Sequence, residues 1–248
     1  MATDALTLPA APRIRPANPP SDRLFFGAMV VVLYATVYYG FAKTYYAAGM
    51  MRATLPAPII HIHAALMTLW LLLLLVQVGL VIARKVAWHR SLGVFGFFVA
   101  LAMVIVGPIA ATNALRRGEA PLGLDALTFY IVPLTAIALF AVFAFAAWRA
   151  RRKAADHKRL ILIANIALID AAVGRWPVAF FEHHAPAQDL VPFGFLLALV
   201  IYDLISQRKV LKSTVWASIM LMAVHLTRVP LGQTHAWHAF ATFMLGHG

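Results

Sequence analysis

The chain has 248 residues, of which 62% are hydrophobic and 12% are charged, and it contains no cysteine. Soluble domains are roughly 45–50% apolar and about 25% charged, so this composition excludes an ordinary soluble domain and predicts a protein whose solvent is largely lipid. The absence of cysteine excludes disulfides, thiolate metal ligands and cysteine-held iron–sulfur clusters on this chain, and leaves His, Met, Asp, Glu and Asn as metal ligands.

The formal net charge of +12 does not indicate nucleic-acid binding. The basic residues lie between apolar segments rather than on one folded face. Cationic residues also collect in the cytoplasmic loops of membrane proteins, where they contact anionic lipid headgroups. We therefore expect the lipid bilayer as a partner, a membrane-complex subunit as a further candidate partner, and no nucleic acid.

Seven apolar segments follow a proline-rich arm that covers residues 1–23 and that is predicted to be disordered or extended. The segments have 15–25 residues, close to the roughly 20 that cross a bilayer as a helix, so the sequence predicts an all-α, seven-helix transmembrane bundle over residues 24–230. The segments cover residues 24–46, 59–83, 91–115, 126–148, 160–176, 191–205 and 214–229.

The tail, residues 231–248, is too short to cross a bilayer. Trp237, Ala241 and Met244 share one helical face, and His235, His238 and Thr242 share another. This pattern predicts an amphipathic helix that lies at the membrane surface.

The distribution of basic residues predicts the orientation. Fifteen lie in the N-terminal arm and in the loops after the second, fourth and sixth segments, and six lie in the other loops or at the other helix ends. The positive-inside rule therefore places the N-terminus in the cytoplasm and the C-terminus on the outer, periplasmic side.

Three predicted helices place an ionisable residue near the outer surface. At a rise of about 1.5 Å per residue, His63 lies about 5–8 Å inside the membrane, Asp170 about 9 Å and His225 about 6 Å. His61 and His63 point about 200° apart on a helix, so they cannot both bind one metal. The face of His63 is the more polar one and is expected to line the bundle interior, whereas His61 lies on a stripe of small residues that suits helix packing.

Asp170 is the costliest residue to place in lipid, and its presence allows three interpretations. It forms an ion pair or hydrogen bond that locks three helices together. Alternatively, it joins His63 and His225 in a metal or heme site, as a ligand or by orienting an imidazole. In the third interpretation it is a protonatable site in a transporter.

His89 and His157 each open a predicted helix on the cytoplasmic side, in the sequences WHRSLG and DHKRLI. Beside Arg and Lys, they are expected either to contact lipid phosphate or to form a second, inner cofactor site. Two sites at opposite depths are the pattern of a transmembrane electron carrier.

Five short sequences are similar to those of uncharacterised bacterial multi-pass membrane proteins: FAKTYY, PIIHIHAALMTLW, HRSLG, HKRLILIANIAL and YDL. The resemblance covers about residues 24–230 and implies a bacterial inner-membrane location. More loosely, histidines in a helix bundle and a helix that begins HR-x-L-G resemble small b-type cytochromes and oxidase-assembly membrane proteins. That second resemblance implies heme b or a transition metal as cofactor.

The first functional hypothesis is therefore an inner-membrane protein that holds heme b or a metal near the periplasmic face, with His61, His63 and His225 as candidate cofactor ligands and Asp170 as a further metal ligand. It would serve electron transfer or respiratory-enzyme assembly. A proton-coupled transporter that uses Asp170, and a non-catalytic accessory subunit of a membrane complex, are the alternatives. The sequence carries no GxGxxG, P-loop, HExxH or GxSxG motif, so it predicts no particular enzyme activity.

Overall fold

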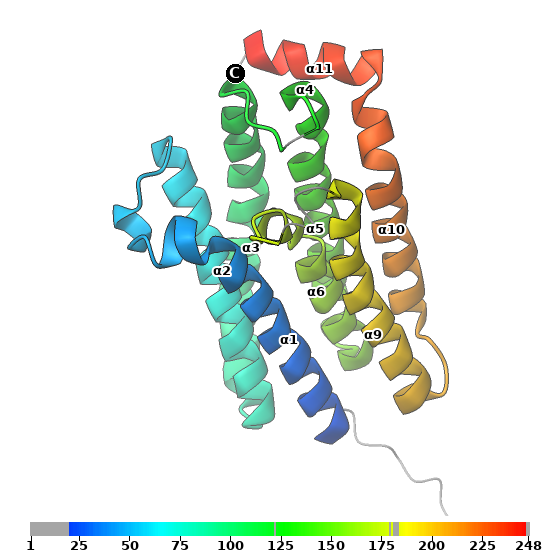
Figure 1. Ribbon diagram of the computed structural model, residues 1–248. Helices are drawn as coiled ribbons and strands as arrows, with labels where there is room; N and C mark the ends of the chain where they lie inside the picture. The colour runs from blue at the N-terminus through cyan, green and yellow to red at the C-terminus, as the bar shows by residue number, and fades with distance from the viewer. Residues whose placement is uncertain (1–19, 122, 179, 181–183, 247–248) are drawn as a thin grey trace, which may run out of the picture.

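The computed structural model describes residues 20–121, 123–178, 180 and 184–246. It is 82% helical, and no strand occurs among the described residues. Figure 1 shows long helices side by side, with the last helix lying across one end of them. The predicted all-α class is confirmed.

The long helices are separated by short turns and by three short 3₁₀ or π segments. The α-helices are α1 (Pro20–Phe41), α2 (Pro58–Ile82), α3 (Val86–Arg116), α4 (Ala126–Phe129), α5 (Ile131–Arg149), α6 (Ala154–Ile166), α7 (Asp170–Val173), α9 (Leu190–Gln207), α10 (Lys212–Gly232) and α11 (His235–Gly246). The other segments are η1 (Ala42–Tyr46), η2 (Met50–Arg52) and η3 (Ala185–Asp189). Asp125 caps α4 as its position predicts, since its Oδ1 accepts a hydrogen bond from the backbone N–H of Thr128 at 2.9 Å.

Six helical stretches of the described chain are long and apolar enough to cross a membrane. Their outward faces are apolar too: Phe98, Phe145 and Leu226 are each at least 60% exposed. Such surfaces would be unfavourable in water but suit lipid chains. The protein is therefore a multi-pass membrane protein in a lipid bilayer environment.

The fifth predicted segment, residues 160–176, is not one continuous helix. It is divided between α6, which has 13 residues, and the four-residue α7, with a turn at residues 167–169 between them. At about 1.5 Å per residue α6 is about 20 Å long, shorter than the roughly 30 Å hydrocarbon layer. Neighbouring helices bury it, with Ile163, Ile166 and Val173 fully inside the protein. Irregular backbone is tolerated at membrane depth when protein covers it, so seven crossings remain a prediction.

The basic loops gather at one end of the bundle. Figure 1 shows the start of α1 and the α2–α3, α5–α6 and α9–α10 connections at the same end. These connections carry seven basic residues: Arg84, Lys85, Arg151, Arg152, Lys153, Arg208 and Lys209. The arrangement matches the charge asymmetry on which the predicted orientation depends.

The tail forms the predicted helix, α11, which lies across the ends of α3, α4 and α10. The indole N–H of Trp237 donates to the carbonyl of Leu127 at 2.8 Å, and Nε2 of His238 lies 3.0 Å from Oγ1 of Thr128. Ala241 is fully buried. The position of α11 at the membrane surface stays a prediction.

Gly40 allows α1 to pack closely on α7. A Cβ at this position would lie 2.8 Å from the Cα and carbonyl carbon of Ala172, where backbone atoms cannot move aside. We expect Gly40→Ala to lower the free energy of unfolding by about 1–3 kcal/mol, because overpacking forces α1 and α7 apart. The control is Gly79→Ala, since a Cβ at Gly79 meets nothing within 4 Å. Gly79→Ala should leave stability unchanged or stabilise α2 by about 0.5–1 kcal/mol. Unfolding in detergent measures both variants, and a Gly40→Ala protein at least as stable as Gly79→Ala would contradict the close packing of α1 on α7.

Candidate functional site

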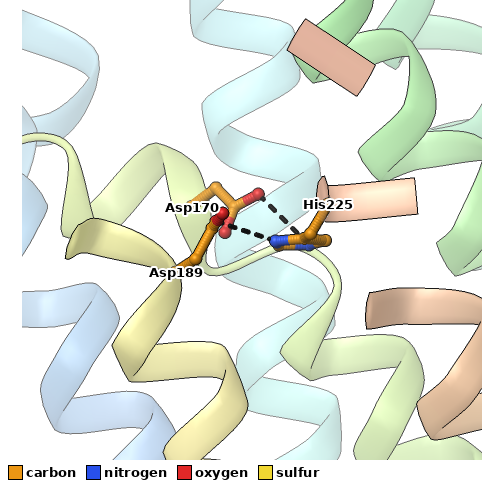
Figure 2. Close-up of side chains that lie close together, drawn as sticks. All are labelled: Asp170, Asp189 and His225. Carbon is orange, nitrogen blue, oxygen red and sulfur yellow. Dashed lines mark hydrogen bonds and ion pairs between the residues drawn. The ribbon is translucent and has the colours of Figure 1, made fainter. Parts of the chain in front are cut away.

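Four charged or titratable side chains meet inside the bundle and form what we call the Asp170 cluster: Asp170, Asp189, His225 and Arg228. Asp170 begins α7, and Asp189 ends η3 directly before α9. His225 and Arg228 are three residues apart on α10, so they share a helix face. Figure 2 shows both carboxylates directed toward the imidazole.

Arg228 bridges the two carboxylates. Its NH1 donates to Oδ2 of Asp170 at 2.5 Å, and its NH2 donates to Oδ1 of Asp189 at 3.1 Å. The side chain of Arg228 is 8% exposed, and those of Asp170 and Asp189 are 14% and 23% exposed. Ion pairs so far removed from water are strong but require every partner, because a lone charge there is costly. The cluster therefore holds α7, the start of α9 and α10 together.

The imidazole of His225 is paired on one side only. Its Nδ1 lies 2.9 Å from Oδ1 of Asp189, and because a carboxylate accepts, Nδ1 carries the proton. Its Nε2 is buried without a hydrogen-bond partner and lies 3.6 Å from Oδ2 of Asp170. In the neutral ring, a lone pair on Nε2 therefore faces a carboxylate oxygen. A proton on Nε2 would turn this unfavourable contact into an attractive one.

The charges of the cluster lead to the same conclusion. With a neutral imidazole, two carboxylates and one guanidinium leave a net charge of −1 in a largely buried site. Binding one proton brings the sum to zero. A buried site with unbalanced charge is unfavourable, so the cluster is one positive charge short of neutrality.

A metal ion is the other cation that could supply this charge. Ligand atoms of Asp170, Asp189 and His225 all lie within 4.8 Å of one another, the one such group among the residues that the structure describes. Carboxylate and imidazole ligands suit several divalent metals. However, Arg228 already donates to both carboxylates, and a metal would have to share them with a guanidinium. The geometry fits a proton better than a metal.

The structure brings together Asp170 and His225, as their predicted depths suggested, but not His63. Over the described chain, neither His63 nor His61 belongs to a group of three ligands. The structure therefore does not include His63 in the group that Asp170 and His225 form, and a cofactor site shared by the three stays a prediction. The reason is the position of α2 in the plane of the membrane, not its depth. This helix packs against α1 and α3, and Figure 1 shows it on the opposite side of the bundle from α10. Both histidines have a buried Nδ1 without a hydrogen-bond partner, and any role of theirs as cofactor ligands stays a prediction.

Sequence reasoning missed Asp189. Asp189 lies in the connection just before the predicted segment 191–205, and on the outer side the sequence singled out only residues within the predicted segments. A usable signal was present, because a carboxylate directly before an apolar run stands at a helix N-terminus near the membrane surface.

His89 and His157, the inner candidates, do lie together. Their ring centroids are 6.3 Å apart, and the rings are nearly perpendicular at 84°. Nδ1 of His157 donates to the carbonyl of Ala147 at 2.9 Å, an arrangement common for metal-binding histidines. Nδ1 of His89 is buried without a hydrogen-bond partner. Two imidazoles alone do not complete a metal site, so an inner cofactor site stays a prediction.

A second buried ion pair, between Arg159 of α6 and Asp203 of α9, was not predicted. Oδ1 of Asp203 accepts from Nε and NH2 of Arg159 at 2.8 and 2.5 Å. Its Oδ2 accepts from the hydroxyl of Thr214 at 2.7 Å and the N–H of Leu211 at 3.1 Å. Both charged side chains are completely buried. Both carboxylate oxygens of Asp203 therefore have hydrogen-bond donors, and the ion pair connects α6, α9 and α10.

Asn165, a polar residue inside the fifth predicted segment, already has hydrogen-bond partners. Its Oδ1 accepts from the indole N–H of Trp70 at 2.8 Å, and its Nδ2 donates to the carbonyl of Ile161 at 2.7 Å. Tyr38 is 48% exposed and stacks on Tyr34 and Tyr46. These residues therefore stabilise packing and do not extend the Asp170 cluster.

Comparison with known proteins provides no relative whose function could be considered for this chain. No family model, curated protein or solved structure matches the chain.

Proposed function

We propose that the protein is a proton-coupled membrane carrier in which the Asp170 cluster binds and releases the coupling proton. The observation that supports this most strongly is the buried, unpaired Nε2 of His225, which faces the carboxylate of Asp170. Asp and His residues inside a membrane bundle often mark ion pathways and proton relays.

The mechanism follows from which elements the cluster joins. In the unprotonated state Asp170 is held by Arg228, and Asp189 is held by both Arg228 and His225. A proton on Nε2 draws Asp170 toward His225 and weakens its dependence on Arg228. Since Asp170 lies on α7 and His225 on α10, proton binding shifts the relative energies of two arrangements of these helices. That is the coupling a carrier needs.

The interrupted helix supports the same proposal. Discontinuous helices near the middle of the membrane form the substrate and ion sites of many secondary transporters. Here α6 ends at Ile166 inside the protein, and Asp170 begins the short helix that follows.

We propose a bacterial inner-membrane location, with seven crossings, the N-terminus in the cytoplasm and the C-terminus in the periplasm. The basic connections at one end support this orientation. In it, the short pair α6 and α7 makes the fifth crossing under the cover of its neighbours.

The test is direct measurement of proton binding. Among the pH-dependent changes in the carboxylate and imidazole infrared bands of the purified protein in lipid nanodiscs, one should belong to the Asp170 cluster. Asp170→Asn and His225→Gln should each abolish that change. The matched control is Asp125→Asn, which alters an exposed helix cap at 58% side-chain exposure and should leave the change intact. If both cluster variants kept the wild-type pH response and only lost stability, the cluster would be a helix lock, as expected of an accessory subunit.

A histidine-ligated cofactor, heme b or a transition metal, is the second candidate. The spacing of Asp170, Asp189 and His225 is the observation that favours it at this site. A metal would use the lone pair on Nε2 and one carboxylate oxygen, and it would weaken the hold of Arg228 on both acids. Metal analysis and an absorption spectrum of protein purified without chelator distinguish the two. Stoichiometric metal or a heme spectrum that is lost in His225→Gln would replace the proton proposal.

A further inference from the structure

A second feature lies at the other end of the bundle, away from the Asp170 cluster. An open groove of about 590 Å³ runs between the end of α5, the start of α6 and the start of α10. It lies at the end where the basic connections gather (Figure 1). Six of its lining residues carry the argument: Phe145, Arg149, Lys153, Leu160, Lys212 and Trp216.

Three cations from three different elements converge on the rim. Arg149 ends α5, Lys153 precedes α6 and Lys212 begins α10. Over the described residues, none of the three forms an ion pair with a carboxylate. Like charges repel and are not brought together without a reason, so the rim suits an anion.

The one carboxylate in the groove does not neutralise the rim. Asp156 accepts a hydrogen bond from the hydroxyl of Ser213 at 2.8 Å, which ties α6 to α10. With Asp156 ionised, the groove keeps two positive charges in excess. Its polar side is therefore cationic and partly preorganised.

The other side of the groove is apolar and faces outward. Phe145, one turn before Arg149 on α5, is 60% exposed, and Trp216, one turn after Lys212 on α10, is 39% exposed. Leu160 is buried and closes the groove from within. Thus on both helices an exposed aromatic ring stands one turn deeper in the bundle than a cation. Aromatic rings at this level are typical of the boundary between headgroups and acyl chains.

From this arrangement we infer that the groove binds an anionic phospholipid, with its headgroup phosphate at Arg149, Lys153 and Lys212 and one acyl chain along Phe145 and Trp216. Basic pockets between transmembrane helices at the cytoplasmic side bind anionic headgroups in this way. A free phosphate would use the cations but not the aromatic wall. A zwitterionic lipid would use the wall but gain less from three cations. Only an anionic lipid matches both sides.

The fluorescence of Trp216 reports which lipid occupies the groove. The protein is reconstituted into phosphatidylcholine vesicles that contain either brominated phosphatidylglycerol or brominated phosphatidylcholine as a minor component, and tryptophan quenching is compared. The chain has six tryptophans, so the quenching that comes from Trp216 is the difference between the wild-type protein and Trp216→Phe. Brominated phosphatidylglycerol should quench Trp216 preferentially. With each basic residue near the surface contributing about 1 kcal/mol, we expect a preference of about tenfold or more.

The charge dependence is tested with matched triple variants. Arg149→Gln/Lys153→Gln/Lys212→Gln should remove most of the preference for phosphatidylglycerol. Arg84→Gln/Lys85→Gln/Lys209→Gln removes the same charge at the same end but outside the groove, and should keep it. Equal quenching by the two lipids, or equal loss in both triple variants, would overturn the inference. Relief of quenching by inorganic phosphate would show that the groove recognises phosphate alone and not a lipid.

Discussion

Replacing Asp203 with alanine is expected to lower the free energy of unfolding by about 3–5 kcal/mol, the largest stability loss that we predict for this chain. The change leaves the guanidinium of Arg159 in the protein interior without a counter-ion, with the carbonyl of Ala155 as a hydrogen-bond acceptor and the ring of Phe26 5.6 Å away. It also removes the acceptor for the hydroxyl of Thr214 and for the N–H of Leu211. A buried charge without its counter-ion cannot be solvated, so α6, α9 and α10 should separate at a much lower denaturant concentration.

Two comparisons make this prediction specific. Glu119→Ala breaks an exposed ion pair with Arg117 and should cost no more than about 1 kcal/mol. Replacing both partners, as Arg159→Met/Asp203→Leu, should recover much of the loss, because apolar residues of similar size often substitute for a buried pair. Unfolding midpoints measured in detergent rank the stabilities of Asp203→Ala, Glu119→Ala and the double variant. A double variant no more stable than Asp203→Ala would show that the remaining donors, rather than the lone charge, dominate the cost.

The long helices could be predicted because lipid imposes a simple requirement on the sequence. A crossing helix needs about 20 apolar residues, and the predicted segment 59–83 became α2, Pro58–Ile82, with almost the same bounds. The requirement weakens where protein replaces lipid. The segment 160–176 has enough apolar residues, yet it is surrounded by other helices, and there the chain can turn at residues 167–169 without exposing its backbone to lipid.

The candidate site could be predicted in depth but not in lateral position. Counting residues from a helix end gives depth, which is why Asp170 and His225 were placed at one level. Nothing in helical spacing says which helix is the neighbour of which, and the sequence therefore could not separate His63 on α2 from the helices that hold the cluster. Asp203 shows the same limit, since its partner Arg159 is 44 residues away along the chain, directly before the predicted segment 160–176.

Replacing Arg228 with glutamine should have the second-largest effect and, unlike Asp203→Ala, one that depends on pH. The variant leaves the carboxylates of Asp170 and Asp189 close together, and among the described residues of the cluster only His225 can then carry a positive charge. At neutral pH we expect a loss of about 2–4 kcal/mol, at the lower end for a buried pair because Asp189 keeps some contact with water.

As the pH falls, a proton on His225 or on either carboxylate replaces the lost charge. The folded variant binds this proton more tightly than the unfolded chain does, so its stability should rise toward acid relative to wild type. Adding Asp170→Asn should restore stability at neutral pH for the same reason, since it removes one negative charge. Unfolding midpoints between about pH 5 and pH 8 measure both effects.

The control for Arg228 is Arg117→Gln. Arg117 forms an ion pair with Glu119 and takes no part in the Asp170 cluster. Its loss should lower stability by no more than about 1 kcal/mol, and equally at every pH in this range. If Arg228→Gln behaved in the same pH-independent way, the cluster would not exchange a proton with solvent while folded, and the coupling step of the proposed carrier would have no site. If stability instead recovers both in acid and with Asp170→Asn, the balance of charge controls this part of the bundle, and a proton can supply the positive charge that Arg228→Gln removes.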